Sequence, residues 1–292
     1  MSLTPAYQEE NEKSMTVAGQ FCHFSLRWTV NALVLCALGF GGAAVKGGSD
    51  PVAQLATRVA PSPETPNPKL VAALKIARSS LAALESVEDY EAIFVKRELL
   101  GKKLVTQKMF LKLREKPFSV YVRFLRPHTG REVIYVEGKN GGHLLAHGTG
   151  LEALAGTVRI HPTSRDALKD NRYPITMLGM TKMLRKIIEQ WERELTDHDV
   201  DVKYFPNAKL GSVECIVLET THKQSHPGAR FYRTRLFIEK ERKLPIRVEQ
   251  YAFPRRARQR PVLVEEYTYL EVRTNVGLTD HDFETSNPAY DF

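Results

Sequence analysis

Two histidines, His143 and His147, stand four residues apart in the stretch "EGKNGGHLLAHGTG". On a helix this spacing would bring two zinc ligands to one face. However, Asn140-Gly141 is the strongest short hairpin signal, and the flanking glycines leave no room for a helix. On a strand the two residues lie roughly 13 Å apart at about 3.3 Å per residue, too far to share a zinc ion held at about 2 Å. The stretch therefore predicts a β-hairpin and no metal site.

Other patterns with catalytic potential are incomplete. The "HGTG" at His147 resembles the glycine-rich oxyanion loop of some lipases, but the sequence has no G-x-S-x-G motif to supply the nucleophile. It also lacks G-x-G-x-x-G, P-loop, C-x-x-C and H-E-x-x-H motifs. His281 stands between Asp280 and Asp282, where a turn with solvated charges is expected. We predict no catalytic residues, no metal and no cofactor, and keep a hydrolase only as the weakest alternative.

Charge and the N-terminal region suggest where the protein works. The 292 residues include 42 Lys and Arg against 34 Asp and Glu, and the net charge of +8 favours anionic partners. After Arg27 runs "WTVNALVLCALGFGGAA", which is too short for a membrane span and typical of a secretory signal. We predict that residues 1–44 are a signal peptide, or an N-terminal anchor if they stay uncleaved. The mature protein would then be periplasmic or otherwise extracytoplasmic.

The remaining chain divides into a linker and one domain. Residues 45–68 hold five prolines among Ser and Thr and predict a flexible linker. Residues 69–292 predict a single domain that opens with a helix, because apolar residues recur every three or four positions from Leu70 to Leu84. Period-two alternation then predicts nine strands, near residues 90–99, 103–115, 117–125, 131–138, 143–148, 212–222, 229–241, 243–253 and 261–274.

One long helix is predicted in the middle of the domain. Its apolar stripe is Met177, Met180, Leu184, Ile187, Ile188, Trp191 and Leu195. Methionine adapts to varied apolar shapes, so this stripe can face a ligand, although most such stripes simply pack on a sheet. Both interpretations stay open.

The fold class follows from these elements. Eight or nine antiparallel strands with one helix in front and one in the middle predict an α+β, mostly β protein. Its sheet would be strongly curved, an incomplete barrel with helices packed on one face. Several strands are apolar on both faces, as where Ile93 and Val95 point opposite to Phe94, and such strands need a partner or a cavity on the second face.

The sequence also resembles known families. The segments "YEAIFVKREL", "PFSVYVRFLRPHTGREVIYVEGKNGGHLLAHG", "NRYPIT" and "VEEYTYLEVRTNVGLTDHDFE" together resemble the bacterial domain of unknown function 1571. More distantly, the C-terminal part is similar to LolA-like lipoprotein carriers. That similarity implies an incomplete antiparallel barrel, covered by helices, that holds acyl chains.

Two functional hypotheses follow. The first is a carrier that binds an acyl chain, lipid or lipoprotein in a half-barrel cavity, with seven predicted ligand-binding residues: Phe94, Phe110, Phe118, Phe124, Met177, Met180 and Trp191. The second is a non-enzymatic envelope module that contacts an anionic membrane surface through its densest basic cluster: Arg255, Arg256, Arg258 and Arg260. The same arginines can equally be a solvated hairpin tip. We expect a monomer and no nucleic-acid partner.

Overall fold

The computed structural model describes residues 65–256 and 258–292. The predicted signal peptide and most of the predicted linker lie outside these residues. Within the described part, no helix is both long and apolar enough to cross a membrane.

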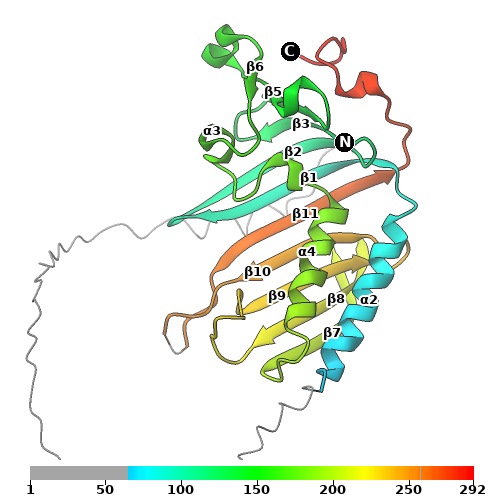
Figure 1. The fold of residues 1–292 in the computed structure, drawn as a ribbon, viewed down its shortest axis with the longest axis vertical. Helices are drawn as coiled ribbons and strands as arrows, with labels where there is room; N and C mark the ends of the chain where they lie inside the picture. The colour runs from blue at the N-terminus through cyan, green and yellow to red at the C-terminus, as the bar shows by residue number, and fades with distance from the viewer. Residues whose placement is uncertain (1–64, 257) are drawn as a thin grey trace, which may run out of the picture. The chain divides into compact units, whose positions relative to one another are not determined.

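The domain is built on a single antiparallel sheet of eleven strands (Figure 1). The strands are β1 (Asp89–Leu100), β2 (Lys103–Arg114), β3 (Ser119–Arg126), β4 (Glu132–Val136), β5 (Leu144–His147), β6 (Val158–Ile160), β7 (Val200–Leu210), β8 (Val213–His222), β9 (Arg233–Glu239), β10 (Pro245–Tyr251) and β11 (Leu263–Thr274). Their order is β6-β5-β4-β3-β2-β1-β11-β10-β9-β8-β7. Because β6 and β7 stand at opposite ends of this order, the described sheet does not close into a barrel.

The centre of the sheet joins distant parts of the chain. β1 pairs with β2 through a tight turn, in which Leu100 lies opposite Lys103. On its other side β1 pairs with β11, so that Phe94 lies opposite Tyr269. All other neighbours in the sheet are consecutive in the chain, so the sheet consists of two meanders joined by the β1–β11 pair.

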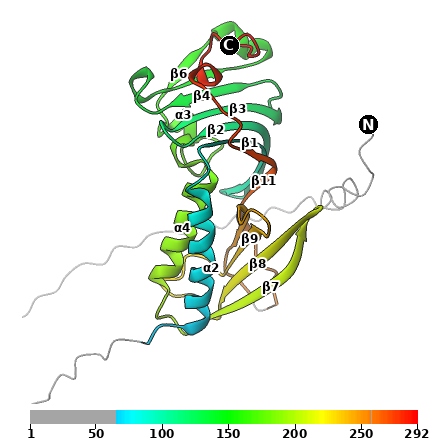
Figure 2. The same ribbon diagram turned by 90° about the vertical axis from the view of Figure 1, so that its right-hand side faces the viewer.

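Two long helices cover one face of the sheet. The helical segments are α2 (Pro68–Leu84), η2 (Asn140–Gly142), η3 (Gly150–Ala155), α3 (Arg165–Leu168), η4 (Ile175–Met177), α4 (Met180–Arg193) and η5 (Asp280–Phe283). Figure 1 shows α4 and α2 in front of the β7 end of the sheet, and Figure 2 shows the two helices side by side along one face of β7 to β9. We call this covered face the inner face. The prediction of helices packed on one face is confirmed.

The start of each long helix has a local cause. The side chain of Asn67 accepts hydrogen bonds from the backbone N–H groups of Lys69 and Leu70, and Pro68 occupies the first turn of α2. α4 begins at Met180 rather than at Met177, because Gly179 has a φ of 121° that breaks the helical path. A side chain at position 179 would also meet Leu113 at 3.0 Å.

The stretch with His143 and His147, residues 137–150, lies in the predicted hairpin. β4 and β5 pair antiparallel, with Glu132 opposite His147, and η2 forms the connection between them. His143 lies just before β5, and its ring contacts that of His161.

Two strands were not predicted. The sheet has eleven strands rather than eight or nine, because β6 and β7 carry no clear alternation. β7 is a sheet edge with mostly exposed residues, and Pro206 lies at its irregular pairing between Phe205 and Ala208. Proline in a strand normally argues against a strand, but edges and bulges tolerate it.

Two apolar clusters lie on the two faces. The main core lies on the inner face and contains the fully buried Leu184, Trp191 and Leu236. A smaller cluster of Tyr121, Ile134, Val136 and Phe283 lies on the outer face, beneath the C-terminal segment.

Candidate functional site

A cavity of about 620 Å³ lies on the inner face, next to the part that α2 and α4 cover. Its walls come from strands on one side and from the segment between β5 and the end of α4 on the other. The strands contribute a largely apolar wall: Phe94, Met109, Val122, Phe124, Val133, Leu144 and Tyr269. The opposite wall includes Ile175, Met177, Leu178, Met183 and Ile187. The cavity is therefore bordered by the segment that carries Met177 and Met183.

Charged groups also line the cavity, where β1 and β11 lie side by side. Lys96 and Glu98 follow Phe94 on the buried face of β1 and point inward, and their Nζ and Oε2 atoms lie 3.2 Å apart. Lys96 also donates to the backbone carbonyl of Asp170 and to the side chain of Asn171, and the Tyr267 hydroxyl donates to Glu98. Burial lowers the pKa of Lys96, and the neighbouring Glu98 offsets part of this effect.

A second charged pair completes this polar region. Arg172 Nε donates to Glu265 Oε2 over 2.8 Å, and the Tyr173 hydroxyl donates to the same oxygen over 3.1 Å. Burial raises the pKa of Glu265, while Arg172 and Tyr173 act in the opposite direction. The cavity therefore combines an apolar wall with a region of paired charges. That combination suits a molecule with a long apolar part and a polar end.

The structure brings three of the seven predicted ligand-binding residues together. Phe94, Phe124 and Met177 line the cavity. Phe118, Met180 and Trp191 belong to the packed core, at 6%, 0% and 0% exposed, and do not reach it.

Phe110 lies on the other face of the sheet. Met109 and Leu111 on either side of it point inward, so the alternation of β2 turns Phe110 toward the small outer cluster. Phe110 therefore cannot line the cavity.

The four predicted surface arginines lie in the connection between β10 and β11. Arg255, Arg256, Arg258 and Arg260 are all exposed. The side chain of Gln259 accepts a hydrogen bond from the backbone N–H of Arg255 and so orders the loop. This exposure is compatible with both interpretations of the cluster, a solvated hairpin tip and contact with an anionic surface.

Several cavity residues were missed, although the sequence carried a signal for some of them. Gln107 and Met109 share the inward face of β2 with Leu111 and Leu113, so period two places them correctly once that face is known. Tyr173, which lines the cavity, and Arg172 beside it lie in an irregular segment, whose position no periodicity predicts.

Similar solved structures share low identity with the chain. A DUF1329 family protein from Desulfovibrio piger is 16% identical, with a TM-score of 0.36, and the match covers 75% of this chain and 98% of that protein. The lipoprotein LppX from Mycobacterium tuberculosis is 12% identical, with a TM-score of 0.42, over 73% of this chain and 98% of its own. A LolA superfamily protein from Nitrosomonas europaea is also 12% identical, with a TM-score of 0.29, over 71% and 97%.

No curated protein matches the chain. A family model described as "Protein of unknown function (DUF1571)" matches residues 87–292, which is most of the described domain. The family that the sequence segments resembled is thereby confirmed, and the chain belongs to the DUF1571 family.

Proposed function

We propose that the protein is a non-enzymatic carrier that binds the apolar part of an amphiphilic molecule, such as the acyl chain of a lipid or lipoprotein. The observation that carries this proposal is the cavity of about 620 Å³ with its wall of aromatic, aliphatic and methionine side chains. Ligand pockets typically measure about 300–1,000 Å³ and combine such walls with a few polar groups. Burial of apolar ligand surface would supply about 25 cal/mol per Å².

The polar region gives the bound molecule an orientation. Lys96, Glu98, Arg172 and Glu265 are held by one another and by tyrosines, so they form a fixed set of dipoles and charges. An acyl chain would lie along Phe94 and Phe124, away from these groups, with its polar end toward them. Burying a polar end without hydrogen-bond partners would cost free energy, and this region supplies partners.

We also propose that the carrier works outside the cytoplasm, in the periplasm or on the envelope. The support is the signal-like pattern of residues 1–44 and the net charge of +8. Detection of the mature domain in the periplasmic fraction tests this location, and full retention in the cytoplasm would contradict it.

Mass spectrometry of molecules extracted from the purified protein tests the carrier directly. We expect a co-purified lipid or fatty acid, and titration with a fluorescent fatty acid should show saturable binding. Intrinsic fluorescence is a poor readout, because Trp191 is fully buried in the core and does not line the cavity.

A pair of variants separates cavity binding from surface adsorption. Ala146→Phe combined with Ala167→Phe places two rings in the cavity and should weaken binding at least roughly tenfold, a change of about 1.4 kcal/mol. Val71→Phe adds a ring on the exposed side of α2 and should leave binding unchanged. Equal affinities for wild type and the double variant, with no extractable lipid, would overturn the proposal.

A second candidate is contact with an anionic membrane surface. The observation that favours it is the exposure of all four arginines in one short loop. Each basic residue near an anionic surface contributes about 1 kcal/mol, so replacing the four by Ser should strongly weaken binding to phosphatidylserine vesicles. A matched control replaces four other exposed basic residues: Lys75, Lys102, Lys103 and Arg185. If both variants lose the same affinity, the loop has no special role.

A further inference from the structure

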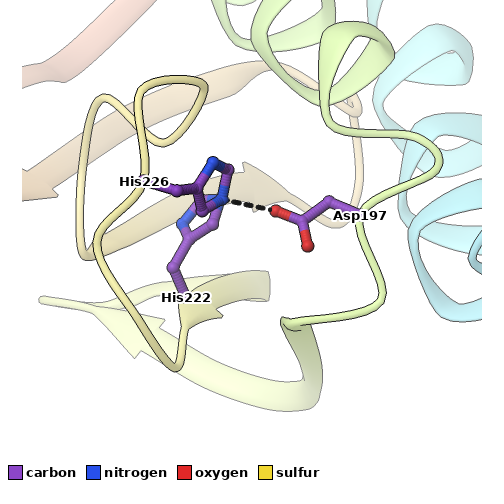
Figure 3. A group of neighbouring side chains, drawn as sticks. All are labelled: Asp197, His222 and His226. Atoms are coloured by element: carbon purple, nitrogen blue, oxygen red, sulfur yellow. Dashed lines mark hydrogen bonds and ion pairs between the residues drawn. The ribbon is translucent and has the colours of Figure 1, made fainter.

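A cluster of metal-binding side chains lies outside the cavity, where α4 ends and β8 ends (Figure 3). Asp197 lies in the turn after α4, His222 is the last residue of β8, and His226 lies in the following loop. One oxygen or nitrogen atom from each lies within 4.8 Å of the other two. Asp197 Oδ2 is 2.8 Å from His226 Nε2 and 3.9 Å from His222 Nε2.

A buried carboxylate, that of Glu194, stands beside His222 but is not one of this group of three. Glu194 Oε1 lies 3.6 Å from His222 Nε2, and the side chains of Glu194 and His222 are only 3% and 1% exposed. Both carboxylate oxygens of Glu194 and both ring nitrogens of His222 lack a hydrogen-bond partner among the described residues. Leaving a buried polar atom unpaired costs about 1–3 kcal/mol, so four such atoms at one point require an explanation.

We propose that this cluster binds one zinc ion through three side chains, Asp197, His222 and His226, with the fourth position open to solvent. Two imidazoles with a carboxylate form a donor set that suits Zn²⁺. With bonds of about 2.0–2.1 Å, the ligand atoms of a tetrahedral zinc site lie about 3.3–3.4 Å apart. The two distances from Asp197 Oδ2, 2.8 Å to His226 Nε2 and 3.9 Å to His222 Nε2, lie on both sides of that value.

The surrounding structure holds the donors in place and leaves access for an ion. The side-chain amide of Asn67 donates to the backbone carbonyl of Asp197 over 3.1 Å, and the backbone N–H of His222 donates to Tyr232 over 2.9 Å. The ring of Phe253 covers His222, with the two centroids 6.2 Å apart. The side chain of His226 is 37% exposed and so lies on the solvent side.

Zinc bound here would join two regions that the cavity also uses. Glu194 and Asp197 follow α4, and the loop after His222 leads to Arg230 and Phe231, which line the cavity together with Gln190 of α4. An ion would therefore fix the β8–β9 loop to the end of α4. Zinc binding does not depend on the carrier function, and each can fail alone.

The test uses the full chain after treatment with a chelator. Titration with Zn²⁺ against a chromophoric chelator should show one tightly bound ion per chain, and the Tm should rise with zinc, because a ligand of the folded state stabilises it. Co²⁺ in place of zinc should give the strong visible absorption of a tetrahedral site. Failure to bind zinc, or a Co²⁺ spectrum of a fully hydrated ion, would overturn the proposal.

Variants assign the donors. His222→Ala removes a buried donor and also risks misfolding, so His226→Gln at the solvent side is the decisive change. Loss of one ligand should weaken zinc binding by at least about 100-fold, more than the 10–100-fold typical of an outer-shell partner.

The control variant His281→Gln changes an exposed histidine elsewhere and should leave the affinity for zinc unchanged. If His226→Gln binds zinc like wild type, Asp197 and His226 form only a hydrogen-bonded pair. The Ala146→Phe/Ala167→Phe variant should keep zinc binding while it loses fatty acid.

Discussion

The two parts of the inner face differ in what covers them. Over β7 to β10, α2 and α4 provide long apolar stripes, and residues such as Leu184, Leu218 and Leu236 are at most 1% exposed. Over β1 to β5, the cover comes from residues 148–157 and 161–179, which flank β6 and whose helical pieces have at most six residues. The apolar faces of long helices pack directly against the side chains of the strands, whereas the short helical pieces leave a space between themselves and the strands. The cavity therefore results from the cover and not from the strands.

The largest expected contrast is between two methionines three residues apart. Met180 is fully buried in the core, and Met177 lines the cavity. Met180→Ala should lower the free energy of unfolding by about 2–5 kcal/mol, because it opens a void in packed surroundings. Met177→Ala enlarges an existing hollow and should cost less than about 1 kcal/mol. Urea unfolding followed by circular dichroism measures both.

Equal losses for the two methionine variants would break the comparison. They would mean that the cavity wall is as tightly packed as the core beneath α4. A larger loss for Met177→Ala would mean that the segment from Gly148 to Gly179 is held by this residue.

The opposite change, a larger side chain, tests the same contrast from the other direction. Ala77 of α2 is fully buried, and Ala146 of β5 faces the cavity. Ala77→Leu should destabilise by about 1–3 kcal/mol, because a packed core has no room for three more carbons. Ala146→Leu should change stability by less than about 0.5 kcal/mol. A destabilisation of similar size at Ala146 would show that the cavity closes in solution.

The sequence predicts the inner face only in part, and the reason is physical. β1 is apolar on two faces, and there period two separates Phe94 from Ile93 and Val95 without showing which face the helices cover. On β2 the alternation itself places Phe110 with Lys108 and Lys112, opposite the apolar face. The choice on β1 depends on where α4 and the C-terminal segment pack, which is tertiary information. β7 was missed because an exposed edge strand needs no alternation.

The histidine spacing gives a similar lesson. His143 and His147 were rejected as a metal pair because a strand keeps them apart, whereas His222 and His226 have the same spacing and lie with their rings 5.7 Å apart. Here the strand ends at His222 and the loop folds back. Local patterns cannot foresee that return, nor the approach of Asp197 from the end of α4.

The part of the sheet that bears the cavity is also held from its outer face. η5 and the residues after it pack on β2 to β4, and the turn predicted around His281 is present. Its acidic residues are not simply solvated, since Asp280 pairs with Arg114 and Asp282 pairs with Lys112. The outer face of this part is therefore directly packed, whereas its inner face borders the cavity.

The smallest expected effect is the pH dependence of stability that comes from Asp282 in the C-terminal segment. Burial raises the pKa of Asp282, but the ammonium of Lys112 at 2.7 Å and the backbone N–H of Thr279 lower it by more, so its pKa lies below 3.8. A carboxyl group whose pKa is lower in the folded than in the unfolded state stabilises the folded protein at pH values above its unfolded pKa. This contribution disappears as the pH falls through the folded pKa.

Asp282→Asn should therefore lower the free energy of unfolding by at most about 1 kcal/mol near neutral pH, and the difference in this free energy between the variant and wild type should shrink by about pH 3. Glu284→Gln, at an exposed neighbouring position, should show a smaller difference. Urea unfolding at neutral and acidic pH measures the difference in free energy of unfolding between Asp282→Asn and wild type. A difference that stays constant would mean that the charge of Asp282 does not hold the C-terminal segment on the sheet. The apolar contacts of Phe283 would then be sufficient to cover the outer face.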